Sequence, residues 1–187
     1  MIILASQSPR RRELLDQIGV AHRAAPVHVD ETPRPGEAPD AFVRRVTLDK
    51  ARAGLERHPD QAVLAADTCV VLDGQPLGKP GDEEHAVAML LELAGRGHEV
   101  LTGVALLRNQ EENYRLSRSQ VRFRAITEEE ARRYWATGEP ADKAGGYAVQ
   151  GRGALFIEHI AGSYSGIMGL PLFETGELLA EAGLLKV

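Results

Sequence analysis

The segment Ser6-Gln-Ser-Pro-Arg-Arg11 places hydroxyl and guanidinium groups at the predicted start of a helix. An apolar run at residues 2–5 precedes it, and Ser8 followed by proline is a typical helix beginning. Free backbone N–H groups and the positive end of the helix dipole attract anions at such a turn. Arg10 and Arg11 add guanidinium groups, which bind phosphate oxygens in pairs. The segment therefore predicts an anion site, although a plain helix cap followed by solvated arginines would use the same residue types.

Asp67 is the second candidate, because it interrupts an otherwise apolar stretch. Residues 61–66 are predicted to form one buried strand and residues 69–72 another, so that Asp67 ends the first strand and Thr68 follows it. In α/β sheets the ligand crevice usually lies at the carboxyl ends of strands. A carboxylate there can hold a divalent cation or orient a water molecule. The alternative is a turn residue between two strands.

Two lysines are further candidates. Lys50 shares a helix face with Val43 and Val46, and this apolar face should point inward. A lysine is rarely buried without a partner, so Lys50 either extends to the surface or reaches into a cleft. Lys79 follows a predicted hairpin turn at residues 73–74, where an exposed loop lysine is the simpler interpretation.

The segment 142–151 has the composition of a binding turn. Its paired glycines, Gly145 and Gly146, permit positive φ or a close approach of the backbone to another group. Tyr147 and Gln150 offer a ring for stacking and an amide for hydrogen bonds, which would suit recognition of a nucleobase. A simple glycine-rich turn is the alternative.

Two other residues carry weaker signals. Glu31 lies in the proline-rich stretch 28–39, which is predicted to be a loop, and a single carboxylate in a loop is usually solvated. His98 precedes a predicted strand, and a single histidine there is more often structural or solvated than a ligand.

The elements that would position these residues alternate between helices and strands. Apolar runs and period-two patterns predict strands at residues 2–5, 61–66, 69–72, 100–107, 114–126 and 154–160. Start and stop signals predict helices at 8–19, from 40, at 82–95, from 127 and at 172–182, with Ser8, Asp40, Asp82 and Thr127 as N-caps. Since hairpins join at least two strand pairs, we expect an α/β fold whose mixed, twisted sheet is flanked by helices.

Composition narrows the class of protein. The length suits one domain spanning residues 1–187, and 43% apolar residues are enough for a core. A net charge of −5 argues against binding of nucleic acid polymers, but residues 1–12 hold three arginines and no acidic residue, which leaves room for a small phosphate pocket. No apolar stretch is long enough to span a membrane, and the single cysteine, Cys69, excludes an internal disulfide. We therefore expect a cytoplasmic protein.

Taken in order along the chain, these segments resemble the Maf family of nucleoside triphosphate pyrophosphatases, once called septum formation inhibitors. Each segment is short, but the ordered set covers nearly the whole chain. The matching segments are residues 4–11, 14–15, 30–31, 50–51, 66–68, 78–80, 98–104, 142–151 and 169–172.

This resemblance implies hydrolysis of a nucleoside triphosphate between the α and β phosphates, giving a monophosphate and pyrophosphate. It also implies an elongated fold with two lobes and a central cleft, a Mg²⁺ or Mn²⁺ ion, a cytoplasmic location and a homodimer. Asp67 would be the proton acceptor and would hold the ion together with Glu31. The groups expected around the triphosphate are Ser8, Arg10, Arg11, Lys50 and Lys79.

The resemblance also indicates a substrate. Arg10, Thr68 and Gln150 fall at positions that separate the subgroups of the family, and these residue types resemble the subgroup that acts on dTTP and UTP. Gln150 would then hydrogen-bond the pyrimidine edge. The loop 29–34 instead resembles the subgroup that acts on 7-methyl-GTP, and hydrolysis of this or another modified nucleotide is the alternative function. A non-catalytic regulator of cell division that binds nucleotide or protein is the alternative from a different class.

Overall fold

The computed structural model describes residues 1–109 and 111–186 of the chain. Helices and strands alternate along the first half of the chain, and short 3-10 turns take the place of longer elements between residues 139 and 156. In chain order the strands and α-helices are β1 (Ile2–Leu4), α1 (Pro9–Gln17), β2 (His22–Ala24), α2 (Pro39–Arg57), β3 (Val63–Leu72), β4 (Gln75–Leu77), α3 (Glu83–Leu93), β5 (Gly97–Arg108), β6 (Glu111–Phe123), α4 (Glu128–Trp135), β7 (Ile157–Ala161), α5 (Tyr164–Met168) and α6 (Leu172–Glu181).

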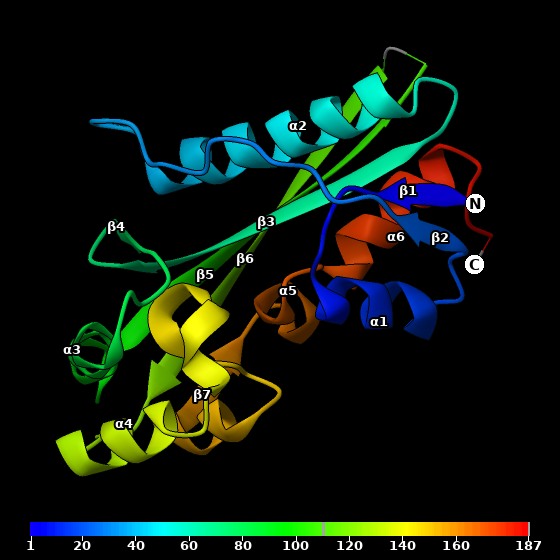
Figure 1. Cartoon of the computed structure of the whole chain (residues 1–187). Coiled ribbons are helices and arrows are strands. Elements are labelled where there is room, and N and C mark those ends of the chain that lie inside the picture. The colour runs from blue at the N-terminus through cyan, green and yellow to red at the C-terminus, as the bar shows by residue number, and fades with distance from the viewer. Residues whose placement is uncertain (110, 187) are drawn as a thin grey trace.

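One seven-stranded sheet organises the molecule, with strand order β2-β1-β3-β5-β6-β7 and β4 paired to the far end of β3. β1 pairs in parallel with β2 and with β3, whereas all other pairs are antiparallel. The long strands β3, β5 and β6 run the length of the molecule. Elements β1, β2, α1 and α6 gather at one end of them, and α3, α4 and β7 at the other (Figure 1). The prediction of a mixed, helix-flanked sheet in an elongated molecule is confirmed.

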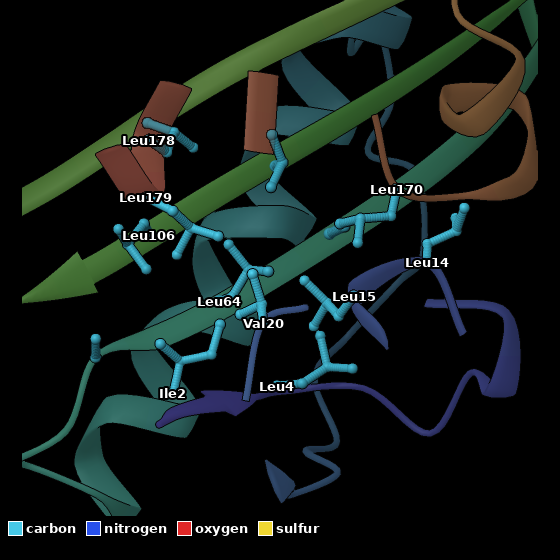
Figure 2. Packing of buried hydrophobic residues seen from close by; sticks show 13 residues of the cluster. Ile2, Leu4, Leu14, Leu15, Val20, Leu64, Leu106, Leu170, Leu178 and Leu179 are labelled. Carbon is cyan, nitrogen blue, oxygen red and sulfur yellow. The ribbon is translucent and has the colours of Figure 1, made fainter. Parts of the chain in front are cut away.

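Two separate hydrophobic clusters fill the two ends of the sheet. At the first end, Leu64 of β3 and Leu106 of β5 pack with Leu15 of α1, and Leu178 and Leu179 of α6 close the same cluster (Figure 2). At the other end, the buried residues of the second cluster come from the far half of β3 and from α3, β6 and α4, and they include Val70, Leu90, Phe123 and Tyr134. β3 therefore belongs to both lobes, and the boundary between the lobes lies near the middle of this strand.

Helix α2 covers the opposite face of the same strands. Its apolar residues Val43 and Val46 are fully buried and pack with Cys69 of β3 and Leu101 of β5. Lys50 lies one turn further along this face and is only 8% exposed. The apolar face of α2 therefore points inward as expected, and of the two alternatives for Lys50 the extension to the surface is excluded.

The structure corrects the interpretation of Asp67. Residues 63–72 form one continuous strand rather than two, and Asp67 lies in its middle, opposite Gly103 of β5. The prediction that Asp67 lies at the end of a strand is therefore wrong. The polar pair Asp67-Thr68 resembled a break because it interrupts the apolar pattern, but the antiparallel pairing with β5 continues through both residues.

Several smaller expectations also differ from the structure. Helix α2 begins at Pro39 with Ala38 as N-cap, so Asp40 lies inside the first turn and is not the cap. Residues 154–156 belong to a 3-10 turn, and β7 begins only at Ile157. The short elements β2 and α5 were not expected, because three to five residues are too few to show a period.

The predicted caps of α3 and α4 and the predicted hairpin turn are confirmed. Thr127 and Glu130 form the expected capping box of α4, and Asp82 caps α3 through its side chain. Asp73 and Gly74 both have positive φ, as the tight hairpin between β3 and β4 requires. Within the two described ranges, no helix is both long enough and apolar enough to cross a bilayer.

Candidate functional site

A cleft of about 530 Å³ opens between the two lobes. Its walls come from the turn after β1, the loop before α2, the middle of β3, the loop after β4 and the turns between residues 142 and 150. All of the residues named from the sequence as site candidates line it: Ser8, Arg10, Arg11, Glu31, Lys50, Asp67, Thr68, Lys79 and Gln150.

The sheet itself creates this opening. On one side of β3, β1 pairs with Val63 and Leu64, and β4 pairs with residues 70–72. Between these two partners the edge of β3 borders the cleft. Side chains on both faces of the strand reach the same space around this edge, because successive residues alternate in direction. Asp67 therefore points toward α2 and Thr68 toward α5, yet both line the cleft.

Lys50 and two carboxylates form the charged centre of the site. The Lys50 ammonium donates to Asp67 Oδ1 at 2.7 Å and lies 2.9 Å from Glu31 Oε1. The Lys50 and Asp67 side chains are 10% and 9% exposed, whereas that of Glu31 is 51% exposed. Two elements and a loop thus converge on one nitrogen atom, and the contact explains why a lysine is tolerated on the buried face of α2.

The turn after β1 presents a desolvated guanidinium. Arg11 donates from Nε to the carbonyl of Gly169 at 2.7 Å and from a terminal nitrogen to Ser6 Oγ at 3.0 Å. Burial lowers the pKa of Arg11, partly offset by the Asp67 carboxylate, which raises it. Ser8 occupies the N-cap position as expected, but its hydroxyl makes no capping bond. The Ser8 hydroxyl is therefore available to a ligand.

The second lobe contributes the facing wall. Arg10 lies 4.0 Å from the Asp142 carboxylate, and Lys143 donates to that carboxylate at 2.6 Å. The Gly145 N–H donates to the carbonyl of Gly78 at 3.0 Å, which ties this wall to the loop that carries Lys79. Gly145 and Gly146 both have φ of +68°, so the expected need for glycine is confirmed at these two positions.

Gln150 differs in burial from the residues around it. It is exposed at the rim of the cleft, whereas the preceding residues 147–149 are buried. Tyr147, Val70 and Val100 give the adjoining lining an apolar character. A flat, partly apolar ring would fit such a lining, with its polar edge turned toward the rim amide.

Several lining residues are not among the site residues predicted from the sequence. His28, Asp142, Lys143 and Met168 border the cleft, and no role was assigned to them. Asp142 and Lys143 lie inside the segment 142–151, which the sequence indicates as a binding turn, so membership of this segment was a usable signal. His28 and Met168 gave no signal, because only the folding of distant loops brings them here.

The charges of the cleft contrast with those of the whole chain. Its cationic side chains outnumber its carboxylates, although the chain as a whole carries a net charge of −5. A pocket of this kind favours a small ligand with several negative charges. The cationic side chains are Arg10, Arg11, Lys50, Lys79 and Lys143, and the carboxylates are Glu31, Asp67 and Asp142.

A clamp from α2 holds the loop that supplies Glu31. Arg45 donates to both carboxylate oxygens of Glu37, at 2.7 and 2.8 Å, and to the carbonyls of Asp30 and Thr32. The Arg45 hydrogen bond lowers the pKa of Glu37 to about 2. The backbone on both sides of Glu31 is thus fixed to the helix that carries Lys50.

The carboxylates suit a divalent cation that is completed by its ligand. Glu31 and Asp67 already converge on one cationic nitrogen, and oxygen donors of this type are those that Mg²⁺ and Mn²⁺ prefer. Across residues 1–109 and 111–186, no three His, Cys, Asp or Glu side chains form a group that could hold a metal ion. Magnesium commonly takes one or two carboxylates and fills its other positions with water and phosphate oxygens, so the donor set fits such an ion.

His98 lies beneath the cleft, in contact with its lining. Its Nε2 lies 2.8 Å from the Tyr147 hydroxyl, and its ring packs edge-to-face on Phe123 at 5.0 Å. Burial lowers the pKa of His98 to about 4. A neutral, buried imidazole supports the structural interpretation made from the sequence.

Comparison with known proteins gives one consistent result. A family model described as Maf-like protein matches residues 1–182. Three curated relatives are each named dTTP/UTP pyrophosphatase. The protein of Alkalilimnicola ehrlichii is 56% identical over 186 residues, which cover 96% of this chain and 92% of that protein. That of Methylococcus capsulatus is 56% identical over 184 residues, with 98% and 91% covered, and that of Aromatoleum aromaticum is 54% identical over 196 residues, with 97% and 95% covered.

The buried imidazole generates a prediction about pH. The pKa of His98 is lower in the folded protein than in the unfolded chain, so the unfolded chain takes up the proton first as the pH falls. Stability is therefore lost as the pH falls from about 6.5 toward 4, and at pH 4.5 the loss from this residue is about 2–3 kcal/mol. Urea unfolding of the wild type and of His98→Gln at pH 7 and 4.5 measures it. The wild type should lose more stability than the variant, and a parallel loss in both proteins would contradict the assignment.

Proposed function

The chain belongs to the Maf family, and from this membership we propose that it is a nucleoside triphosphate pyrophosphatase acting on dTTP and UTP. The motif-based resemblance to the family is confirmed by the family model and by relatives at 49–56% identity. The observation that carries the proposal is the cleft, which gathers Arg10, Arg11, Lys50 and Lys79 around a carboxylate centre.

Neutralisation of charge is the first task of such a site. A nucleoside triphosphate carries about four negative charges, and catalysis of phosphoryl and nucleotidyl transfer rests mainly on positioning and electrostatic stabilisation. In the proposed complex, Arg11 and the Ser8 hydroxyl bind the phosphates from the turn after β1. Arg10 and Lys79 close on them from two sides of the cleft. The Arg10–Asp142 contact at 4.0 Å is long enough to yield to a phosphate without a large loss.

Asp67 is proposed to receive the proton of the attacking water. Water adds to the α phosphorus, the bond to the bridging oxygen breaks, and pyrophosphate leaves with the bonding electrons. Lys50 contacts Asp67 through Oδ1 and so leaves Oδ2 for the water. The same contact fixes the orientation of the carboxylate, which a general base needs before its basicity matters.

Glu31 and Asp67 are proposed to hold a Mg²⁺ or Mn²⁺ ion together with phosphate oxygens. When bound, such an ion withdraws charge from the phosphate oxygens and helps to orient the triphosphate. Lys50 contacts one oxygen of each carboxylate, Glu31 Oε1 and Asp67 Oδ1, so the other oxygen of each would be available to the ion. The hydrogen bonds from Arg45 to the backbone on both sides of Glu31 would keep this carboxylate in reach of the ion.

Gln150 and Thr68 are proposed to recognise the base. The Gln150 amide is exposed at the rim, so a bound pyrimidine would cover it and make its hydrogen bonds decisive. A covered amide discriminates well, because a base with the wrong donor pattern leaves it without a partner. Thr68 is held in position by the Thr102 hydroxyl, 3.0 Å away.

A nucleotide panel with pyrophosphate detection tests the proposal, and Asp67→Asn tests its mechanism. The wild type with Mg²⁺ or Mn²⁺ should release pyrophosphate and monophosphate from dTTP and UTP faster than from 7-methyl-GTP or the other nucleotides. Asp67→Asn should lower the rate by about 100-fold or more, within the range of general-base contributions. The control is Asp60→Asn, an exposed carboxylate outside the cleft, which should leave the rate unchanged.

Three results would contradict parts of this proposal. Preference for 7-methyl-GTP would assign the chain to the alternative subgroup, and binding of nucleotide without turnover would favour a non-catalytic regulator. Normal turnover by Asp67→Asn would remove this carboxylate from the mechanism.

Substitution of Gln150 tests base recognition separately. Gln150→Glu replaces the N–H donors of the amide by an acceptor oxygen. The side chain can then no longer donate a hydrogen bond to an acceptor atom of the pyrimidine. We expect kcat/KM for dTTP and UTP to fall by about 10-fold or more, and the ranking against 7-methyl-GTP to change. Gln120→Glu on β6 is the control, since this residue is exposed outside the cleft. An unchanged ranking in Gln150→Glu would show that the amide does not contact the base.

We further propose that the protein is a homodimer and acts in the cytoplasm, where free nucleoside triphosphates occur. Light scattering after gel filtration should give twice the chain mass of 20.3 kDa. A mass of one chain at micromolar concentration would contradict the dimer.

A further inference from the structure

The turn that carries Gln150 is held by two residues that do not touch the cleft. Gln150 follows the buried residues 147–149 and precedes a 3-10 turn at Arg152–Phe156. A backbone hydrogen bond from Gly151 to Ala148, 3.3 Å long, closes this turn. One long hydrogen bond is weak support for a side chain that has to discriminate between bases.

Tyr134 holds the turn on the side before Gln150. This tyrosine lies in α4, is only 2% exposed and accepts a hydrogen bond from the Ala148 N–H at 3.0 Å. The same hydroxyl donates to Glu139 Oε1 at 2.6 Å. Burial and the Glu139 contact both raise the pKa of Tyr134, so the hydroxyl keeps its proton and stays a donor to Glu139.

Glu139 holds the turn on the side after Gln150. Its carboxylate accepts hydrogen bonds from the N–H groups of Arg152 at 3.0 Å and Gly153 at 3.1 Å. Burial acts to raise the pKa of Glu139, but these bonds and the Tyr134 hydroxyl outweigh it and lower the pKa. The group is therefore an ionised, acceptor-only anchor for three donors.

The backbone is packed so closely around this pair that side chains are excluded. A Cβ atom at Gly151 would come within 2.5 Å of the Glu139 carboxylate, and one at Gly153 would lie 2.7 Å from the Tyr134 hydroxyl. The two glycines therefore serve the approach of the chain to Tyr134 and Glu139. Neither Tyr134 nor Glu139 lines the cleft.

The Glu139 backbone also supports the charged wall. Its carbonyl accepts a hydrogen bond from the Lys143 ammonium at 2.9 Å, and that ammonium in turn contacts Asp142. One residue thus fixes the turn with its side chain and the opposite end of the same segment with its backbone.

We propose that Glu139, together with Tyr134, is a positioning residue that sets base specificity by fixing the Gln150 turn at both of its ends. The inference rests on the proposed role of Gln150 in base recognition. A turn fixed only on one side of Gln150 would let the Gln150 amide rotate or shift. A misplaced amide distinguishes poorly between bases.

The substitution Glu139→Gln tests this role, because it keeps the size of the side chain and removes its charge. The Gln amide turns an N–H toward at least one backbone N–H, so one anchor is lost. We expect kcat/KM for dTTP and UTP to fall about 10-fold through KM, with kcat nearly unchanged, and the selectivity over 7-methyl-GTP to fall by a similar factor. Tyr134→Phe, which leaves the Ala148 N–H without its acceptor, should act in the same direction.

The matched control is Glu84→Gln. Glu84 contacts Arg132 across α3 and α4 in the same lobe, so its loss weakens an ion-pair network without reaching the turn. This variant should keep both KM and selectivity. If Glu139→Gln loses activity equally on all nucleotides, through kcat and with a lowered unfolding midpoint, then Glu139 is a stability residue only and the proposal is overturned. Unchanged selectivity would overturn it as well.

Amide hydrogen exchange separates this inference from the proposed function. In Glu139→Gln the amides of Arg152 and Gly153 should exchange faster than in the wild type, while in Glu84→Gln they should not. Unchanged exchange would overturn the inference even if dTTP is hydrolysed. If the wild type hydrolyses no nucleotide, the proposed function fails, and calorimetric binding of dTTP against 7-methyl-GTP then decides the inference: equal selectivity in wild type and Glu139→Gln overturns it.

Discussion

The cleft is organised around one buried ammonium group placed between carboxylates. Lys50 and Asp67 are both almost fully covered by α2 and β3, and charged groups tolerate such an environment only when they face each other at hydrogen-bond distance. The removal of one partner from a buried pair generally costs about 3–5 kcal/mol. This constraint fixes the register of α2 on the sheet and keeps the Asp67 carboxylate at a defined place. The Glu31 loop joins the same nitrogen, and Arg45 holds that loop to the helix.

The second requirement is a strand that belongs to both lobes. β3 packs with the N- and C-terminal elements through Leu64 and with α3 and β6 through Val70. Its edge is covered by β1 and β4 at the two ends and borders the cleft between them. Because strand residues alternate in direction, one exposed edge brings Asp67 and Thr68 into the same cavity from opposite faces. The sheet thus holds Asp67 and Thr68 in a rigid strand and leaves both side chains open to a ligand in the cleft.

The remaining parts of the site depend on turns rather than on regular elements. The phosphate end uses the turn after β1, where Arg11 is fixed by Gly169 and Ser6. The proposed base end uses the segment 142–153, where Glu139 and Tyr134 replace the hydrogen bonds that a helix or strand would supply. Positive charge at the first end and apolar lining at the second match the two halves of a nucleotide.

The sequence alone determined the mixed α/β class, most helix ends and the charged and polar candidates that line the cleft, because capping signals, periodicity and short motifs are local. The inward direction of the helix face that carries Lys50 was also readable, but the sequence left open whether this lysine extends to the surface or reaches into a cleft. Tertiary structure decided which partner it has, and that Asp67 lies within a continuous strand instead of at its end. It also decided that Gln150 is exposed and that Tyr134 and Glu139 support its turn. These features depend on contacts between segments far apart in the chain, and a polar residue looks the same in sequence whether it breaks a strand or faces a cleft.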